Sequence, residues 1–254
     1  MSFLSEIIER KRQRVEEAKQ RFPLEALERR SHSHRLREAL LRDGINIIAE
    51  FKRRSPSKGI IRVDADLKQI AKSYEAGGAV AMSVLTEEDY FSGSLADLRA
   101  AKSIIDLPVL RKDFVVDDYQ LYESAAAGAD AVLLIVAALD DDALLRLRRL
   151  AEDEIGMDAL VEVHDRDEMQ RAVDCGATLI GVNNRNLHTF DVSLETSLSL
   201  ASDAPKDAVL ISESGLKSAS DLSRLRDAGY RGFLIGESLM RSDDPATALR
   251  ELIS

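Results

Sequence analysis

Apolar residues recur at helical spacing in the first part of the chain. Leu4, Ile7 and Val15 lie on one stripe of an amphipathic segment whose other positions are mostly Lys, Arg and Glu. Pro23 suits the first position of a short helix that follows. Three helices are therefore predicted, at residues 3–21, 23–27 and 35–41. We expect residues 1–45 to be a helical extension packed on the main domain, rather than a lid over its apolar end or a partner-binding element.

Beyond residue 45, short apolar runs alternate with amphipathic segments. Strands are predicted at residues 46–52, 79–85, 108–112, 131–136, 159–163, 179–183, 208–212 and 232–235. Helices are predicted at residues 66–76, 95–103, 118–127, 141–154, 166–173, 194–201, 219–228 and 245–253. The strands are apolar on both faces, which is typical of a parallel sheet covered by helices.

The number of these repeating units indicates how the sheet is arranged. Eight βα units in about 210 residues fit a closed (β/α)8 barrel, the TIM barrel. An open doubly wound sheet would usually carry a Gly-x-Gly-x-x-Gly turn after its first strand, and this sequence has none. We therefore predict an α/β fold with one domain, residues 1–254, made of the helical extension (1–45) and the barrel (46–254).

A glycine repeat supports closure of the barrel. A small residue followed by glycine ends the helix before every second strand, at Ala76-Gly77, Ala127-Gly128, Cys175-Gly176 and Ala228-Gly229. Glycine after a helix adopts the left-handed conformation at little cost, so each of these glycines is expected to do so. The spacing of about two βα units resembles four quarter-barrels. Cys175 lies within this signal and is interpreted as a buried structural thiol.

Composition restricts the classes of function. The formal net charge of -10 disfavours nonspecific nucleic-acid binding, and an anionic substrate would need local cations. The single cysteine excludes an internal disulfide and a cysteine-rich zinc site. There is no apolar run of membrane-spanning length, and the charged N-terminal stretch does not resemble a signal peptide. We expect a soluble cytoplasmic protein.

Charged residues stand at the C-terminal ends of alternate strands. Lys52 follows the first strand and shares a face with Glu50 and Ile48, because successive strand residues point to opposite faces. Lys112, Glu162 and Glu213 stand at the ends of the third, fifth and seventh strands. Alternate strands of a barrel contribute to the same inward-facing layer, so these side chains are expected to converge. Paired lysines and carboxylates can shift each other's pKa, as acid–base chemistry requires.

A second group of residues suits an anion. The loops after the seventh and eighth strands contain Ser214-Gly215 and Gly236-Glu237, where barrels often bind phosphate through backbone N–H groups. Arg185, in the stretch Asn183-Asn184-Arg185-Asn186-Leu187, is either a phosphate or carboxylate clamp or part of a polar turn.

The histidines and the acidic run do not suggest a metal site. No two histidines have metal-ligand spacing, so no metal is predicted. We expect His32 and His34 to be solvated, and His164 and His188 to stand alone. The run of aspartates at residues 140–142 is interpreted as a helix N-terminal cap, without the spacing of a calcium loop.

Six motifs together resemble the indole-3-glycerol phosphate synthase family. In order along the chain they read IAEFKRRSPSKG (48–59), LRKDF (110–114), LVEVH (160–164), GVNNRNL (181–187), SESG (212–215) and LIGESLM (234–240). The resemblance covers nearly the whole chain. It implies conversion of 1-(2-carboxyphenylamino)-1-deoxyribulose 5-phosphate to indole-3-glycerol phosphate, carbon dioxide and water in tryptophan biosynthesis. It also implies no metal or organic cofactor, and a protein that is usually a monomer.

The resemblance also implies roles for individual residues. Lys112 would be the general acid and Glu162 its acid–base partner, while Lys52 would pair with the substrate carboxylate and exchange the acid role with Lys112 in a later step. Supporting roles would fall to Glu50 and Glu213, which hold the lysines and substrate hydroxyls, and to Asn183, which orients the intermediate. The substrate-binding residues would be Phe114 and Leu187 at the anthranilate ring, and Ser55, Arg185, Gly215, Gly236 and the Glu237 backbone at the phosphate, with Ser214 nearby. The sequence leaves open which lysine acts at which step.

Three alternatives remain at this point. Phosphoribosylanthranilate isomerase, another phosphate-binding barrel enzyme, typically uses a cysteine at the first strand end, where this chain has Glu50 and Lys52. A class I aldolase would use Lys112 as a Schiff-base amine. A non-catalytic anion-binding barrel is the third alternative, and the full set of charged strand ends argues against it. Residues 55–59 are expected to be the hinge and the phosphate-side wall of a mobile lid after the first strand.

Overall fold

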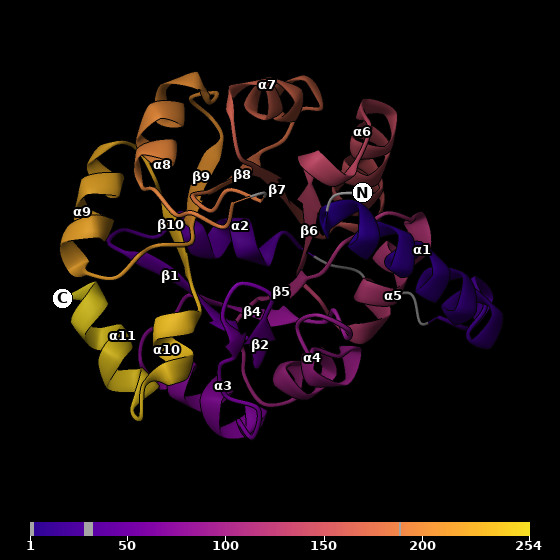
Figure 1. Ribbon diagram of the computed structural model, residues 1–254, viewed down its shortest axis with the longest axis horizontal. Helices are drawn as coiled ribbons and strands as arrows, with labels where there is room; N and C mark the ends of the chain where they lie inside the picture. The colour runs from indigo at the N-terminus through magenta and orange to yellow at the C-terminus, as the bar shows by residue number, and fades with distance from the viewer. Residues whose placement is uncertain (1–2, 28–32, 188) are drawn as a thin grey trace.

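A closed barrel of eight parallel strands forms the centre of the computed structural model, which describes residues 3–27, 33–187 and 189–254 (Figure 1). The strands are β1 (Asn46–Phe51), β4 (Ala81–Leu85), β5 (Val109–Lys112), β6 (Ala131–Ile135), β7 (Asp158–Val163), β8 (Leu179–Asn183), β9 (Val209–Glu213) and β10 (Gly232–Ile235). The ring closes where β1 pairs with both β4 and β10, with Ile48 opposite Ala81 on one side and Leu234 on the other. The predicted (β/α)8 barrel is confirmed.

Helices surround this barrel. They are α3 (Leu67–Ala76), α4 (Leu95–Lys102), α5 (Asp118–Ala127), α6 (Asp141–Arg149), α7 (Arg166–Asp174), α8 (Glu195–Leu200), α9 (Ala219–Asp227), α10 (Glu237–Arg241) and α11 (Pro245–Ile253). Many begin with a side-chain cap. The carboxylate of Asp140 accepts a hydrogen bond from the Ala143 N–H at 2.8 Å, which confirms the predicted cap of α6. The prediction of a helix to residue 154 is only partly right, because α6 changes at Leu150 into a π-helical segment that ends before Gly156.

The glycine repeat is correct at three of its four positions. Gly128, Gly176 and Gly229 adopt the left-handed conformation, with φ of 91°, 76° and 107°. Gly77 does not, since its φ is -79° and the left-handed residue is Gly78, with φ of 91°. Gly77 is instead required for close packing, because a Cβ there would lie 2.9 Å from backbone and side-chain atoms of α11.

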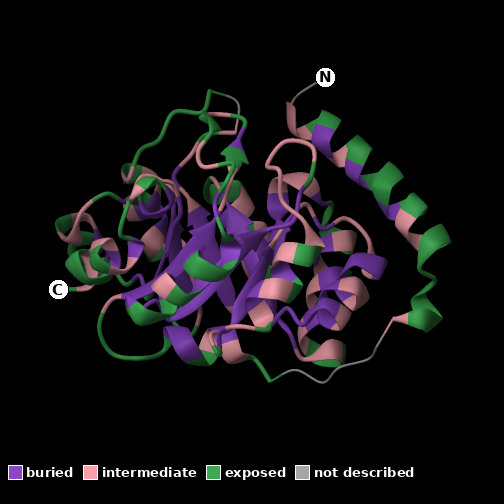
Figure 2. Cartoon of the chain, turned by 90° about the horizontal axis from the view of Figure 1, so that it is seen from below, coloured by how far each residue is buried: buried purple, intermediate pink, exposed green. Residues whose placement is uncertain are grey.

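The buried apolar side chains form two clusters. One fills the interior of the barrel, and the other lies between the strands and the surrounding helices. Ile48 joins the interior cluster with Leu110 and Leu160, whereas Ile47 and Phe51 pack outward against the helices, as the alternation of side chains predicts. The interior cluster also includes Leu36 and Leu40 of α2 (Arg35–Leu40), which close the N-terminal end of the barrel. Figure 2 shows the resulting buried centre.

The N-terminal extension consists of α1 (Phe3–Arg21), the short 3₁₀ helix η1 (Leu24–Ala26) and α2. Helix α1 packs beside α5 on the outside of the barrel (Figure 1). Ile7 and Val15 of its predicted apolar stripe are buried, and so is Lys11. The Lys11 Nζ lies 2.8 Å from a carboxylate oxygen of Asp113, the residue after Lys112. Burial would raise the pKa of Asp113, but Lys11 and Arg111 outweigh it and lower that pKa to about 2.

Across the part of the chain that the structure describes, no helix is long and apolar enough to cross a membrane.

Candidate active site

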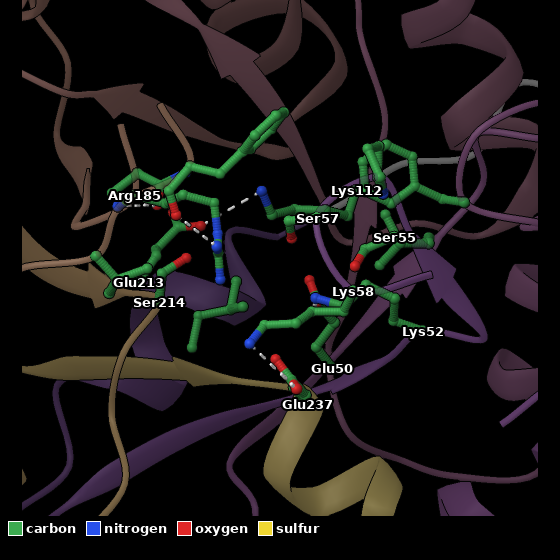
Figure 3. A pocket seen from close by; sticks show the side chains of 18 of the residues that line it. Glu50, Lys52, Ser55, Ser57, Lys58, Lys112, Arg185, Glu213, Ser214 and Glu237 are labelled. Carbon is green, nitrogen blue, oxygen red and sulfur yellow. Dashed lines mark hydrogen bonds and ion pairs between the residues drawn. The ribbon is translucent and has the colours of Figure 1, made fainter. Parts of the chain in front are cut away.

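A cavity of about 910 Å³ opens at the C-terminal ends of the strands (Figure 3). Every site residue predicted from the sequence lines it: Glu50, Lys52, Ser55, Lys112, Phe114, Glu162, Asn183, Arg185, Leu187, Glu213, Ser214, Gly215, Gly236 and Glu237. These residues come from β1, β5, β7, β8 and β9 and from the loops that follow them and β10. The barrel therefore brings together positions that are up to 187 residues apart, from 50 to 237, in one cavity.

Two lysines and three carboxylates form a buried charged cluster at the floor of this cavity. The Lys112 Nζ lies 3.0 Å from Oε2 of Glu162 and 3.3 Å from Oε2 of Glu213. The Lys52 ammonium pairs with the carboxylate of Glu50. Each of the three carboxylate residues is at most 4% exposed. The predicted convergence of the strand ends is thus realised as a network of ion pairs.

Burial and mutual attraction set the protonation of this cluster. Burial would lower the pKa of Lys112, but the carboxylates of Glu162, Glu213 and Glu50 outweigh it and raise that pKa. Burial would also raise the pKa of Glu162, but the Lys112 ammonium, aided by His164, lowers it. For Glu213, burial dominates the opposing effect of Lys112, and with the nearby carboxylates it raises the pKa to about 7. The cluster therefore holds a protonated amine, an ionised carboxylate and a carboxyl that titrates near neutral pH.

Two glycines create the space that the carboxylates occupy. A Cβ at Gly181 would lie 2.3 Å from Oε1 of Glu213, and a Cβ at Gly236 would lie 2.3 Å from Oε1 of Glu50. No side chain fits at either distance. Gly236, predicted as a phosphate-side residue, thus also permits the buried position of Glu50.

A polar network behind the cavity supports the loop after β9. The buried Asn184 side chain donates to Oγ of Ser212 at 3.0 Å and to the carbonyl of Ser214 at 3.1 Å, and it accepts from the Ser197 N–H at 3.0 Å. Ser214 has a φ of 66°, a conformation that is strained for a residue other than glycine. Asn184 was not predicted as a functional residue, and only its place beside Asn183 in a polar stretch hinted at it.

Arg185 and Lys58 bring further positive charge to the cavity. Nη1 of Arg185 donates to the Phe190 carbonyl at 3.0 Å, so its guanidinium is held within its own loop. The Lys58 Nζ lies 3.9 Å from a carboxylate oxygen of Glu237, which also accepts from Arg241 at 3.2 Å. Lys58 belongs to a small hairpin of β2 (Arg54–Ser55) and β3 (Gly59–Ile60) that was not predicted. Whether this hairpin closes over a ligand stays a prediction.

Apolar side chains also line the cavity and are called the apolar wall. Phe114 and Leu187 contribute to it as predicted, and Phe3, Leu4 and Ile7 of α1 contribute as well. The Phe3 ring also packs edge-on against Tyr90, with centroids 5.2 Å apart. The amphipathic stripe of α1 was the only signal for this contribution, and it did not indicate which surface the stripe would cover.

The prediction that His164 stands alone is wrong. Its Nδ1 lies 2.9 Å from a carboxylate oxygen of Glu168, and its Nε2 lies 3.4 Å from Oε1 of Glu162. Burial would lower the pKa of His164, but these two carboxylates raise it to about 10.

His34 is exposed, as expected, and its Nδ1 also lies 3.1 Å from a carboxylate oxygen of Asp158. His32 and His188 lie outside the described residues. Cys175 is buried and donates to the Ala172 carbonyl at 3.2 Å, as expected for a structural thiol. Among residues 3–27, 33–187 and 189–254, no three His, Cys, Asp or Glu side chains are grouped to hold a metal ion.

Replacing Glu213 with glutamine is expected to make the protein progressively more stable relative to the wild type as the pH rises from about 4.5 to about 7, compared with its relative stability at the lower pH. The unfolded carboxyl has a pKa near 4.5, and burial raises the folded value to about 7. Between these values the folded wild type binds more protons than the unfolded chain, so its free energy of unfolding falls as the pH rises. The wild type loses roughly 3 kcal/mol of its free energy of unfolding by pH ~7, at about 1.36 kcal/mol per pKa unit, and the variant does not.

Urea unfolding of both proteins at pH ~5 and pH ~8 measures this difference. The variant also lacks the carboxylate that faces Lys112, so its absolute stability differs at every pH. The raised pKa of Glu213 is therefore tested by comparing the stability difference between variant and wild type at pH ~5 with the same difference at pH ~8. A stability difference that is the same at both pH values would show that Glu213 titrates normally.

Comparison with known proteins gives one consistent family. The sequence profile of "Indole-3-glycerol phosphate synthase" matches residues 4–252. A relative of that name from Koribacter versatilis (strain Ellin345) is 54% identical over 83% of this chain and 80% of its own. Relatives of the same name from Carboxydothermus hydrogenoformans and Bacteroides thetaiotaomicron are 44% and 45% identical, over 99% and 98% of this chain and 100% and 97% of theirs.

Solved structures with low sequence identity share the fold. A 3-hexulose-6-phosphate synthase aligns with a TM-score of 0.66 at 16% identity, over 82% of this chain and 98% of its own. Thiamine phosphate pyrophosphorylase from Pyrococcus furiosus aligns with a TM-score of 0.62 at 16% identity, over 85% and 95%. At this identity the likeness concerns the barrel alone.

Proposed function

The chain belongs to the indole-3-glycerol phosphate synthase family, and from that premise we propose that its buried charged cluster carries out the family's decarboxylating ring closure. The protein is a decarboxylating lyase of tryptophan biosynthesis that acts on a small phosphorylated substrate. The observation that carries the assignment of residues is the contact of Lys112 with both Glu162 and Glu213, at 3.0 and 3.3 Å.

The chemistry calls for an acid and a base in one water-poor site. A ring carbon of the anthranilate group attacks the ketone, so the carbonyl oxygen must receive a proton. Carbon dioxide then leaves, and loss of water requires an acid at the hydroxyl and a base for the remaining proton. Lys112 is the acid in this proposal, since its raised pKa keeps it protonated, and Glu162 is the acid–base partner that returns the proton.

The other cluster residues bind and orient the substrate. The Lys52 ammonium, which pairs with Glu50, attracts the substrate carboxylate and is the second candidate acid. Glu50 and Glu213 hold the lysines and the sugar hydroxyls, and Asn183 orients the intermediate. Phe114 and Leu187 enclose the anthranilate ring within the apolar wall. Burial of these groups strengthens each charge interaction relative to water.

The phosphate lies at the opposite side of the cavity in this proposal. The residues proposed to hold it, Ser55, Arg185, Ser214, Gly215, Gly236 and the backbone of Glu237, all belong to residues that line the cavity. A protein of net charge -10 needs local cations to attract an anion, and Arg185 supplies one within this group. We further propose that the protein acts as a monomer in the cytoplasm.

The alternatives drawn from the sequence fit less well. A Schiff-base aldolase needs a neutral amine, and the carboxylates around Lys112 instead favour its protonated form. The isomerase chemistry typically uses a cysteine at the first strand end, and Cys175 is a buried residue directly after α7.

The direct test is to add 1-(2-carboxyphenylamino)-1-deoxyribulose 5-phosphate and to follow the fluorescence of indole-3-glycerol phosphate. Turnover that persists after chelation and dialysis is expected. Absence of product, with the folded barrel verified by circular dichroism, would overturn the proposed reaction.

Replacing Arg185 with alanine is expected to raise KM roughly 10- to 100-fold and to leave kcat nearly unchanged. A hydrogen bond to a charged group contributes about 1.5–3 kcal/mol, and a phosphate contact made equally in the ground and transition states affects binding alone. Steady-state kinetics measure both constants. Arg185→Lys is the matched variant, because it keeps the charge without the planar fork and should give an intermediate KM. An unchanged KM in Arg185→Ala would remove this residue from the phosphate site.

A further inference from the structure

The histidine at the end of β7 is held between two carboxylates. His164 lies two residues after Glu162, so an extended chain directs both side chains to the same face. Its Nε2 lies 3.4 Å from Oε1 of Glu162, and its Nδ1 lies 2.9 Å from Oε2 of Glu168, in the first turn of α7. The same oxygen of Glu168 accepts a hydrogen bond from the His164 backbone N–H at 2.8 Å. Glu168 therefore fixes both the backbone and the ring of His164.

This arrangement favours the imidazolium form of His164. Neutral imidazole has one N–H donor, whereas both ring nitrogens here face acceptors, so both contacts are favourable only when the ring is protonated. The two arginines of α7 are paired elsewhere, Arg166 with Asp203 and Arg171 with Asp141. The ring is nearly buried, its side chain being 11% exposed, so water screens its contacts weakly.

The two oxygens of Glu162 are divided between two cations. Oε2 faces the Lys112 ammonium at 3.0 Å, and Oε1 faces His164. The remaining charged residues of the cluster are Glu213, Glu50 and Lys52, and Lys52 pairs with Glu50. Two further carboxylates so close by would favour a protonated Glu162, and His164 opposes them from the side away from Lys112.

We propose that His164 is a positioning residue for catalysis, which fixes the rotamer of Glu162 and keeps its carboxylate ionised beside Lys112. This inference rests on the proposed role of Glu162 and deepens it. Without the imidazolium, Glu162 is free to turn away from Lys112, and its pKa rises. Lys112 and Glu162 would then compete for one proton. A smaller fraction of the protein would have a protonated Lys112 beside an ionised Glu162.

Two isosteric variants separate geometry from charge at this position. The amide nitrogen of His164→Gln occupies the place of Nε2, from which a donor can reach Glu162, whereas that of His164→Asn occupies the place of Nδ1 and contacts Glu168 only. For His164→Asn we expect kcat to fall about tenfold, because Glu162 is no longer fixed beside Lys112, with KM within a factor of about two. The acidic limb of the kcat–pH profile should move to higher pH by about one unit. His164→Gln should recover part of kcat while keeping the shifted limb, because the donor returns without the charge.

Controls distinguish this role from packing and from failure of the proposed reaction. Glu168→Gln keeps an acceptor for the His164 ring and backbone but removes the charge, so it should shift the acidic limb in the same direction by less. Arg166→Ala on the exposed side of α7 should leave kcat, KM and the profile unchanged. Wild-type turnover establishes the reaction independently of every His164 variant. Wild-type activity with an unshifted limb in both His164 variants would overturn the positioning role, as would a change confined to KM.

A measurement without substrate tests the same proposal. The ¹⁵N shifts of the His164 ring should show two protonated nitrogens well above pH ~6.5, the ordinary histidine pKa. Titration of His164 near that value would overturn the imidazolium assignment whether or not the variants fold.

Discussion

Replacing Lys112 with alanine is expected to lower kcat by more than about 10²-fold while the barrel remains folded, as for loss of a general acid. Lys112 is the only residue whose ammonium contacts two carboxylates of the cluster among the residues that the structure describes. Lys52 is engaged by Glu50 and faces a different part of the substrate in our proposal. In this proposal Lys52 therefore does not replace Lys112 as the donor of that proton.

The loss of a buried cation also affects stability, so the fold must be checked separately. Removing one partner of a buried ion pair destabilises a protein by about 3–5 kcal/mol when the other stays charged. Glu213 already titrates at about 7, so the cluster can compensate by binding a proton on a carboxylate. Lys112→Met, which keeps the apolar stem of the side chain, is the matched control for packing. Single-turnover assays together with circular dichroism of both variants separate the two effects. Turnover within tenfold of the wild type would refute the acid role.

The side-chain alternation of the strands made the centre of the site predictable. Glu50 and Lys52 lie on the same face as Ile48 because a strand has a period of two, and this holds whatever the neighbouring strands are. Once eight βα units indicated a barrel, the strand ends had to meet at one rim. That topology alone brings Lys112, Glu162 and Glu213 together from three separate segments.

The contacts made by helices were not predictable in the same way. The apolar stripe of the helix predicts that Leu4 and Ile7 share a buried face. It does not predict that this face would line the cavity. The ion pair of Lys11 with Asp113 and the contact of His164 with Glu168 each depend on how a helix is rotated and placed against the barrel. Such placement follows from tertiary packing, which the linear pattern does not contain. The same holds for Gly77, whose role comes from the approach of α11.

The cluster also illustrates a conflict between stability and function. Three nearly buried carboxylates near two lysines leave a net negative charge, and burial with mutual repulsion raises the pKa of Glu213. A core of apolar side chains would be easier to stabilise at this place. The arrangement is reasonable only if the charges are needed for chemistry, since strained or electrostatically unfavourable groups persist where the surrounding fold compensates for them.

Replacing Glu162 with glutamine is expected to lower kcat on the order of 10²–10³-fold, within the range for an acid–base group. The amide has nearly the same shape and can still accept a hydrogen bond from Lys112, so the geometry at 3.0 Å should survive. It cannot take up or return a proton at neutral pH. The variant also removes the largest electrostatic contribution that raises the pKa of Lys112, although Glu213 and Glu50 continue to raise it.

Comparison with Glu213→Gln makes the Glu162 prediction specific. Both carboxylates contact the same ammonium, at 3.0 and 3.3 Å, and both are nearly buried. If Glu162 transfers protons and Glu213 only holds Lys112, Glu162→Gln must lose far more activity, and the acidic limb of its kcat–pH profile must disappear while Glu213→Gln retains one. Steady-state kinetics of both variants across the pH range measure this. Equal losses in the two variants would mean that the carboxylates act through charge alone, and Glu162 would then have no separate role in proton transfer.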